Sequence, residues 1–218
     1  LAGINNILWN VRYSNIEIGK AKLTTIFIIK ILSLLSYLIP KFIITVSKKA
    51  KKIYKVAGYN KKIFKFIPNG YDLSILKVNK LQKVNFKKNI KIKKKVPLIG
   101  NVARYDPQKD HFNLLNALSL IQSRNINFFC VLVGFNINQN NIDLISEIKR
   151  LKLSNHVKLL DQTDNVSQVM NGLDIHVLSS SYGEGFPNVV AESMACGTPC
   201  IVTDVGDSFF IVGKTGWV

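Results

Sequence analysis

Two glutamates stand eight residues apart in the stretch from Ser181 to Gly197, SYGEGFPNVVAESMACG, around a glycine-rich turn. Glu184 lies in the turn, and Glu192 lies about one helical turn into the segment that follows. A carboxylate accepts hydrogen bonds from two hydroxyl groups at once, which suits the vicinal diol of a sugar or ribose ring. The spacing therefore indicates a ligand with a sugar ring at each end, as in a nucleotide sugar.

The turn also has the composition of an anion-binding helix start. A glycine lets the backbone come close to a ligand, and a proline gives up an N–H that the first helical turn leaves unpaired. The backbone N–H groups that remain, with the helix dipole behind them, suit a phosphate or a sugar hydroxyl. The candidate donor-binding residues of this segment are Gly185, Phe186, Pro187, Asn188 and Val189.

Positive charge that could hold a diphosphate occurs earlier, in GNVARYDPQKDHFNLLNAL. Arg104 follows a predicted strand, and Lys109 comes five residues later at the mouth of a predicted helix. A guanidinium fork and an ammonium group can hold a diphosphate and take up charge as it leaves. The sequence contains no Asp-x-Asp pair to carry a divalent metal. It therefore favours leaving-group stabilisation by side chains, with no metal or other cofactor.

These residues also have ordinary structural interpretations. A glutamate near a helix start can simply favour the dipole, and glycines form turns in many proteins. The two glutamates combined with Arg104 and Lys109, on three successive features of one sheet edge, favour a binding site. The three cysteines and three histidines show no disulfide framework or zinc-ligand spacing, and we expect buried thiols in a reducing compartment.

The elements predicted from residue 96 onward place these side chains at one edge of a sheet. Apolar strands alternate with helices, which indicates a parallel sheet covered on both faces. The fold class is therefore α/β, a Rossmann-like doubly wound sheet in which ligands bind beyond the carboxyl ends of the strands. We expect strands at 96–103, 127–134, 157–161, 174–180 and 199–204, and helices at 110–124, at 141–153, before Gly172 and from Asn188.

The most apolar window, from Leu23 to Val46, has to be compared with a transmembrane helix. Lys30 lies inside it and Pro40 divides it, so neither part reaches the ~20 residues that span a bilayer. We expect a buried helix up to about Ile39 and a buried strand from Phe42 to Val46, in preference to a transmembrane helix.

The segments that follow predict a domain boundary. Ser47 is a suitable N-cap for a helix that Gly58 would close, and a short strand then leads into a Pro-Asn-Gly turn. From Lys77 to Lys95 the chain is polar and lysine-rich, and we interpret it as a variable surface connection. The predicted division is 1–75 as the end of a second Rossmann-like domain, 76–95 as a basic linker, and 96–218 as the nucleotide-sugar-binding domain.

Charge and composition narrow the classes of partner. The 218 residues carry a formal charge of +17, which favours polyanions, although AT-biased coding also raises lysine content. A nucleic-acid-binding module is an unfavoured alternative. The chain has no signature of such a fold, and its aromatic residues are not interleaved with the basic runs.

Several motifs together resemble one known family. GEGFPNVVAESMACGTPCIVTDVGD closely resembles the E-x7-E segment of the retaining glycosyltransferases of family 4, also called group 1. VARYDPQKD resembles their Arg-x4-Lys diphosphate segment. ITVSKKAKKIYKVAGYNKKIFKFIPNGYDL resembles the end of their N-terminal domain and the start of the linker. The resemblance implies a GT-B fold, in which two Rossmann-like domains face a cleft and the C-terminal one holds most of the donor.

The resemblance also implies a role for each matching residue. Glu184 would contact the transferred sugar and Glu192 the ribose, while Arg104 and Lys109 would hold the diphosphate. Family members keep the anomeric configuration, usually without a metal, and use UDP-, GDP- or similar sugars. The nucleotide base would lie against the loop after the strand 157–161, at Leu160, Asp161 and Gln162.

The chain departs from the family pattern in two respects. Roughly the first half of the N-terminal domain and the helix that normally follows the final GWV are absent, so we expect a fragment cut at both ends. Tyr13 stands where relatives with a similar segment often have His. The stretch from Trp9 to Asn15 is equally consistent with a buried strand that has a polar end.

The leading functional hypothesis is a retaining, metal-independent glycosyltransferase that moves a hexose from a nucleotide sugar to a glycan or lipid-linked acceptor. A sugar-nucleotide epimerase of the same fold is the alternative, and it would need no acceptor. We expect a cytoplasmic protein with peripheral contact to the inner face of the cytoplasmic membrane. The lysine runs at 48–52, 61–65 and 87–95 would make that contact, or would simply be solvated.

Overall fold

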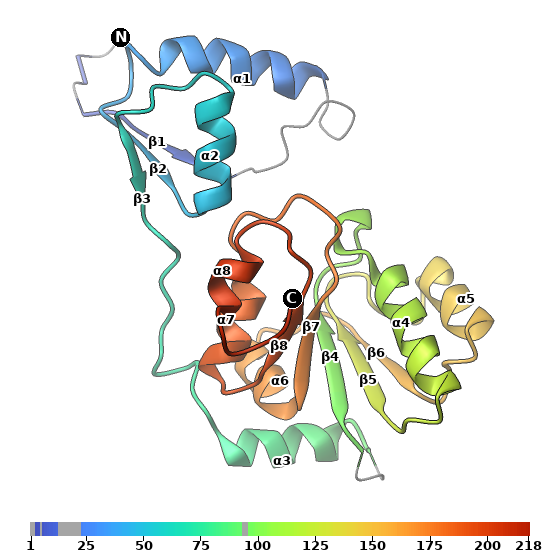
Figure 1. Cartoon of the computed structure of the whole chain (residues 1–218). Coiled ribbons are helices and arrows are strands. Elements are labelled where there is room, and N and C mark those ends of the chain that lie inside the picture. The colour runs from blue at the N-terminus through green and yellow to red at the C-terminus, as the bar shows by residue number, and fades with distance from the viewer. Residues whose placement is uncertain (1–2, 5, 13–22, 93–95) are drawn as a thin grey trace. The chain divides into compact units, whose positions relative to one another are not determined.

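The computed structural model describes residues 3–4, 6–12, 23–92 and 96–218 (Figure 1). Tyr13 lies outside the described residues. The chain divides into two compact units. The first contains Leu1–Gly70 together with Tyr182–Pro187 and Val205–Ser208, and the second contains Tyr71–Ser181, Asn188–Asp204 and Phe209–Val218. The two short segments of the first unit lie within the range 96–218 that the sequence division treats as one domain.

The first unit contains a parallel sheet in the order β1-β2-β3. The predicted helix and strand of the apolar window are both present, as α1 and β2. The expectation that the helix is buried is wrong, because α1 buries only Ile29 and Ser33 and leaves most of its large apolar side chains exposed, and it ends at Leu35. Helix α1 buries Ile29, which packs in one cluster with Ile43 of β2 and the aromatic rings of Tyr54, Tyr59 and Phe64. The elements are β1 (Leu8–Val11), α1 (Leu23–Leu35), β2 (Phe42–Thr45), α2 (Lys48–Val56) and β3 (Phe64–Phe66).

Helix α2 begins and ends where the sequence predicts. The Ser47 hydroxyl accepts a hydrogen bond from the backbone N–H of Ala50 at 3.0 Å, which satisfies one of the unpaired donors of the first turn. Gly58, directly after the C-cap Ala57, has a φ of +97°, a conformation that glycine adopts without strain. Within the described residues, the search for a helix long and apolar enough to cross a membrane finds none.

The second unit is built on a five-stranded parallel sheet in the order β6-β5-β4-β7-β8, so the predicted Rossmann-like topology is confirmed. Its strands are β4 (Leu98–Val102), β5 (Phe129–Val133), β6 (Val157–Leu160), β7 (Ile175–Leu178) and β8 (Cys200–Val202). Its helices are α3 (Lys80–Asn89), α4 (His111–Ser123), α5 (Ile142–Arg150), α6 (Val166–Gly172) and α7 (Asn188–Ala195), with the 3-10 turn η1 (Pro107–Lys109). A further short helix, α8 (Ser208–Val212), begins at the last residue of the first unit.

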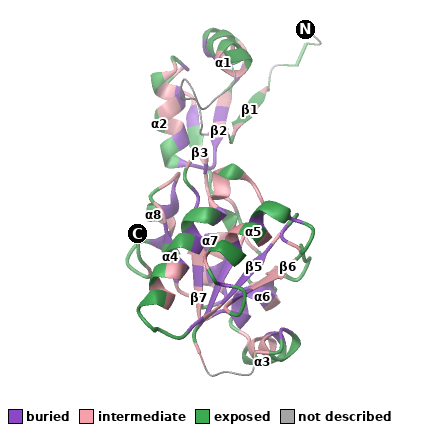
Figure 2. Cartoon of the chain, turned by 90° about the vertical axis from the view of Figure 1, so that its right-hand side faces the viewer, coloured by how far each residue is buried: buried purple, intermediate pink, exposed green. Residues whose placement is uncertain are grey.

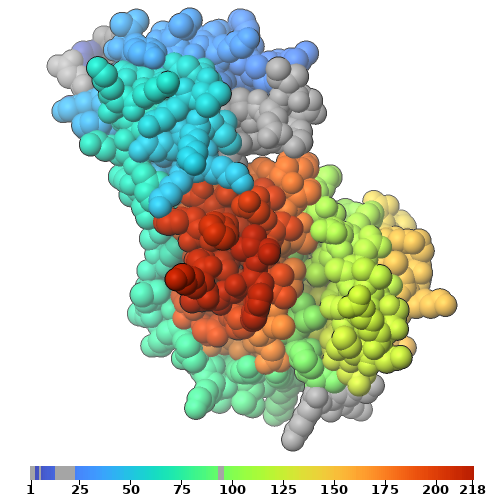
Figure 3. Space-filling model, in the orientation of Figure 1, coloured from blue at the N-terminus to red at the C-terminus, as the bar shows by residue number. Residues whose placement is uncertain are grey.

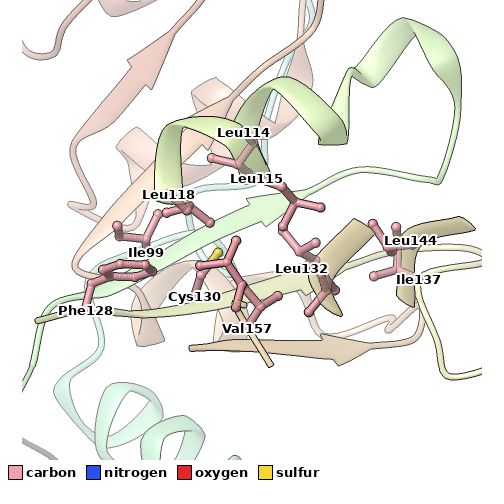
Figure 4. Packing of buried hydrophobic residues seen from close by; sticks show 12 residues of the cluster. Ile99, Leu114, Leu115, Leu118, Phe128, Cys130, Leu132, Ile137, Leu144 and Val157 are labelled. Atoms are coloured by element: carbon pink, nitrogen blue, oxygen red, sulfur yellow. The ribbon is translucent and has the colours of Figure 1, made fainter. Parts of the chain in front are cut away.

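The core of the second unit explains why its strands are apolar on both sides. Leu114, Leu115 and Leu118 of α4 lie over Cys130 and Leu132 of β5 (Figure 4). A separate cluster packs helices α3 and α6 against the same sheet. Figure 2 shows the central strands mostly in the colour of buried residues and the outer faces of the helices as exposed.

The basic segment from Lys77 to Lys95 corrects one expectation. It was interpreted as a variable surface connection, but residues 80–89 form helix α3. The side chain of Asn79 caps this helix by accepting from the N–H of Gln82 at 3.1 Å. Phe86 is 5% exposed and packs so closely on Gly172 that a Cβ there would clash with its ring. One large apolar anchor and a cap therefore replace the stripe of apolar residues by which a helix is usually recognised.

Trp217 extends the hydrogen-bonded ladder beyond the edge strand β8. It donates its N–H to the carbonyl oxygen of Cys200 and accepts from the N–H of Val202, both at 2.9 Å. On β6, the ammonium group of Lys158 donates to the carbonyl oxygen of Ile90, the C-cap residue of α3, at 3.1 Å. In Figure 3 the red C-terminal residues and the yellow residues of α5 mark opposite edges of this unit.

Candidate active site

The carboxyl ends of β4 and β7 meet in the middle of the sheet, because these strands are neighbours. The connection after β7 is bonded to the η1 turn after β4. The Ser179 hydroxyl donates to the carbonyl oxygen of Lys109 at 2.7 Å, and the Ser181 N–H donates to that of Gln108 at 2.9 Å. Two segments some seventy residues apart in sequence are thus held side by side at the edge where a doubly wound sheet binds ligands.

Arg104 lies two residues after β4, with just over half of its side chain exposed. Its Nε donates to Oδ2 of Asp106 at 3.1 Å, and Asp106 also accepts from the N–H of Gln108 at 2.9 Å. The hydrogen bond from Gln108, together with the charge of Arg104, lowers the pKa of Asp106. Asp106 therefore stays ionised and fixes the orientation of the guanidinium group. Because that group is planar, the directions of its remaining N–H groups are fixed as well.

Lys109 closes η1, and Asp110 caps α4 by accepting from the N–H of Asn113 at 3.1 Å. The next residue, His111, is 2% exposed, and no described protein group pairs with either of its ring nitrogens. Burial and the charge of Lys109 lower the pKa of His111 to about 4, so the ring is neutral at pH 7. The cations at this end of the sheet are therefore Arg104 and Lys109, and His111 adds no charge.

Glu192 lies in the middle of α7, which starts at Asn188 directly after Pro187, as the sequence predicts. The helix buries Val190 and Ser193, while Glu192 is only partly buried. Burial raises the pKa of Glu192, because water stabilises its charged form less well there. A carboxylate with a reduced hydration shell is well prepared to accept hydroxyl groups from a ligand.

Glu184 lies in the first unit, in the segment Tyr182–Pro187. It is 7% exposed, which is unusual for a carboxylate, and follows Gly183, whose φ is +75°. Arg104, Lys109 and Glu192 belong to the second unit, in which Arg104 and Lys109 follow the carboxyl end of β4 and Glu192 lies in α7, the helix after β7. Glu184 is joined to the same sheet through the short connection after β7.

The residues predicted to face a base stand at the far side of the same edge. Leu160 ends β6, and Asp161 accepts from the side-chain amide of Asn138 at 3.1 Å and from the N–H of Gln162 at 2.9 Å. Strands β6 and β7 are three neighbours apart, which corresponds to ~14 Å at the usual strand spacing. A single ligand that touches both sides of this edge must therefore be extended.

Gly134 lets the chain after β5 pack directly on the chain after β4. It follows β5 with a φ of +151°, and a Cβ there would be 2.5 Å from the carbonyl carbon of Ala103. Only glycine fits this close to the backbone that leads to Arg104. Within the described part of the chain, no group of three or more His, Cys, Asp or Glu side chains is placed to hold a metal ion.

Three features of this region were not identified from the sequence. Asp106 pairs with Arg104, and the pattern Asp-Pro-Gln, a common start of a tight turn, was the available signal. His111 was counted among ordinary histidines. Asp207 lies in the same unit as Glu184 and ends the segment GEGFPNVVAESMACGTPCIVTDVGD, but that segment does not reveal its contacts, because its partners are about 160 residues earlier in the chain.

The chain is similar to proteins of one family. The family model described as "Glycosyl transferases group 1" matches residues 82–218. EpsF of Bacillus subtilis (strain 168), which carries the name of a glycosyltransferase, is 32% identical over 138 residues. That alignment covers 63% of this chain and 35% of EpsF, so the chain matches about a third of that relative.

Solved structures share the fold. HepE from Anabaena, in complex with UDP, superposes with a TM-score of 0.82 at 22% identity, covering 94% of this chain and 55% of HepE. Sucrose-phosphate synthase from Thermosynechococcus elongatus gives 0.80 at 19% identity, covering 96% and 53%. These likenesses extend over both units and agree with the Rossmann-like α/β architecture of the GT-B fold. Since the family model matches more than half of its length, the chain belongs to the group 1 glycosyl transferases.

Proposed function

We propose that the protein is a retaining glycosyltransferase that moves a hexose from a nucleoside-diphosphate sugar to a glycan or lipid-linked acceptor without a metal ion. The observation that carries this proposal is the order of the elements. Arg104 and Lys109 follow β4, while Glu184 and Glu192 follow β7, the neighbour of β4 in the sheet. An extended ligand with a charged centre requires both cations and hydroxyl acceptors, and these two segments would supply them.

The transfer breaks the bond between the anomeric carbon and a diphosphate oxygen, and it forms a bond from that carbon to the acceptor oxygen. The departing diphosphate oxygen takes the electron pair of the broken bond, so negative charge develops on it, and it accepts the proton that the acceptor hydroxyl loses. Arg104 and Lys109 would stabilise this charge, which removes the need for a metal ion. The fixed orientation of Arg104 by Asp106 supports this role, since a preorganised cation needs no rearrangement during the reaction.

The sugar and nucleoside ends are assigned to different groups. Glu184 would accept hydroxyl groups of the transferred hexose, next to the backbone from Gly185 to Val189. Glu192 would accept the ribose hydroxyls, and the base would lie near Leu160, Asp161 and Gln162. HepE has been solved with UDP and with UDP-glucose, and we therefore propose UDP as the nucleotide of the donor.

Nucleotide titration calorimetry tests this proposal directly. We expect UDP to bind in preference to GDP and ADP. Glu192→Ala should weaken UDP binding by roughly 10- to 150-fold, because a hydrogen bond to a charged group is worth about 1.5–3 kcal/mol. Glu147→Ala is the matched control, since Glu147 lies on α5 and pairs with Arg150. If Glu192→Ala binds UDP as tightly as the wild type, the ribose assignment is wrong.

Contact with an anionic membrane surface is the proposed setting for a lipid-linked acceptor. The support is the +17 charge and its concentration in the runs at 48–52, 61–65 and 87–95. Lys83 and Lys87 are already engaged by Asp174, at 2.8 Å each, and would contribute less. Sedimentation with anionic vesicles should decrease as salt is raised, and binding that ignores salt would contradict the proposal.

A further inference from the structure

Asp207 is a buried carboxylate whose side chain contacts the start of helix α2. It is 3% exposed. Its Oδ1 accepts from the Ser47 hydroxyl at 3.0 Å and from the N–H of Lys49 at 2.9 Å. Its Oδ2 accepts from the N–H of Lys48 at 2.6 Å. Three donors from one short stretch of chain thus converge on this single side chain.

The start of a helix is a favourable environment for a buried carboxylate. The first turn of a helix has N–H groups without partners inside the helix, and the dipole there favours a negative charge. The Ser47 hydroxyl takes part twice, because it donates to Asp207 and accepts from the N–H of Ala50. Hydrogen bonds to an ionised acceptor are the stronger kind. Asp207 is therefore held in one position by both oxygens.

The backbone around Asp207 packs directly on the turn that carries Glu184. The N–H of Asp207 donates to the carbonyl oxygen of Gly185 at 2.9 Å. Gly206 has a φ of +62°, and a Cβ there would be 2.6 Å from the carbonyl carbon of Glu184. On the other side of the turn, a Cβ on Gly185 would be 2.9 Å from the carbonyl oxygen of Arg12. The turn is thus enclosed by backbone on two sides.

We infer that Asp207 is a positioning residue for the donor sugar. Its carboxylate fixes residues 206 and 207 to the start of α2, and these residues fix the backbone of the turn 183–185. The direction of the Glu184 carboxylate depends on that backbone. This inference rests on the proposed contact between Glu184 and the transferred hexose. It assigns Asp207 to the sugar end of the ligand and not to the nucleoside end.

Asp207→Asn is the decisive variant, because it keeps the size of the side chain but removes its charge and replaces one of its two acceptor oxygens by an amide N–H₂. Hydrogen–deuterium exchange should become faster at 48–50, because Lys48 and Lys49 donate to Asp207 and Ala50 donates to the Ser47 hydroxyl that Asp207 holds, and also at 183–186, which lose their support. Ser47→Ala removes only one of the three donors to Asp207 and should have a smaller effect at 183–186. Asp174→Asn is the control. It changes a carboxylate in the second unit that also accepts a backbone N–H, from Leu98 at 2.9 Å, and should leave 183–186 unchanged.

Ligand binding separates a positioning role from general destabilisation. UDP and UDP-glucose are each titrated into the wild type, Asp207→Asn and Asp174→Asn. For Asp207→Asn we expect unchanged affinity for UDP and a loss of roughly 2- to 12-fold for UDP-glucose, the range for one hydrogen bond. The control variant should show the same ratio of the two affinities as the wild type.

The other possible results would each contradict one part of the inference. Faster exchange confined to 48–50 would make Asp207 a helix cap without influence on the turn. Equal losses for UDP and UDP-glucose, or no loss for UDP-glucose, would remove its link to the sugar. If the wild type binds neither ligand, the proposed function fails, while the exchange experiment still decides whether Asp207 positions the turn.

Discussion

The hydroxyl of Tyr71 donates a hydrogen bond to the side-chain oxygen of Asn188 at 2.9 Å. Tyr71 is the first residue of the second unit, and Asn188 is the first residue of α7. The start of the helix that carries Glu192 is therefore tied to a residue 117 positions earlier. The placement of Glu192 depends on a contact that the local sequence of α7 does not contain.

Removing this hydroxyl should weaken the nucleotide site slightly. Tyr71→Phe keeps the ring but loses the hydrogen bond, and UDP affinity should fall by roughly 2- to 10-fold because the start of α7 is less well fixed. Calorimetric titration measures the effect. Tyr37→Phe, at an exposed position of the first unit, is the control and should bind as the wild type does. Equal affinities for the two variants would show that α7 does not need this contact.

The ionised carboxylate of Glu192 should strengthen ligand binding but lower the stability of the folded protein. Its pKa is raised above the ordinary 4.5. Between pH 4.5 and the raised pKa of Glu192, the folded state binds more protons than the unfolded state. The free energy of unfolding therefore falls as pH rises through that window. Glu192→Gln should therefore have a higher melting temperature than the wild type at pH 7, while its UDP affinity is lower.

The melting temperatures of the two proteins should converge at pH 4, where the wild-type carboxyl group is also neutral. Differential scanning fluorimetry at both pH values measures this. A constant difference between the proteins across the pH range would contradict the assigned cause.

His176 should make the fold sensitive to acid. It is fully buried, and burial lowers its pKa from 6.5 to about 4. The unfolded state binds a proton in that window and the folded state does not, so stability is retained above pH 6.5 and lost as pH falls toward 4. The contribution of this one residue is roughly 3 kcal/mol.

His176→Leu should flatten the pH dependence of the free energy of unfolding between pH 7 and 4. Urea denaturation at several pH values gives the slope, which does not depend on how well leucine packs at the site. Retention of the full wild-type slope would assign the acid sensitivity to other groups.

Helix α3 should be an integral part of the second unit. Phe86 is its buried anchor against Gly172, so Phe86→Ala should lower the free energy of unfolding by about 3–5 kcal/mol. Phe135→Ala, at a position 63% exposed, is the control and should cost less than about 1 kcal/mol. Similar small losses for both variants would mean that α3 is only loosely attached.

The alternation of strands and helices could be predicted because the strands of the second unit are mostly apolar and several helices follow a residue that caps them. Ser47 and Asp110 were identified in this way, and both accept the expected N–H groups. Helix α3 could not be predicted, since its stability comes from one phenylalanine and a glycine 86 residues later in the chain. Local patterns do not report such distant pairs.

The same limit applies to the candidate site. The alternation of strands and helices was sufficient to predict that Arg104 and Lys109 follow β4 and that α7 starts at Asn188. The joint role of Arg104, Lys109 and Glu192 at one sheet edge stays a prediction. The partners that orient the site were not predictable. Asp106 beside Arg104 and Asp207 beside Gly185 act through turns whose geometry only the folded chain defines.

The pairing of Trp217 with β8 also bears on how the protein behaves at high concentration. An unpaired edge strand is a template on which another chain can add a strand and begin aggregation. Trp217 occupies part of that template at β8, so less of this edge is open to another chain. Variants that weaken the pairing of Trp217 with β8 should aggregate more readily at high concentration, which an increase in turbidity would show.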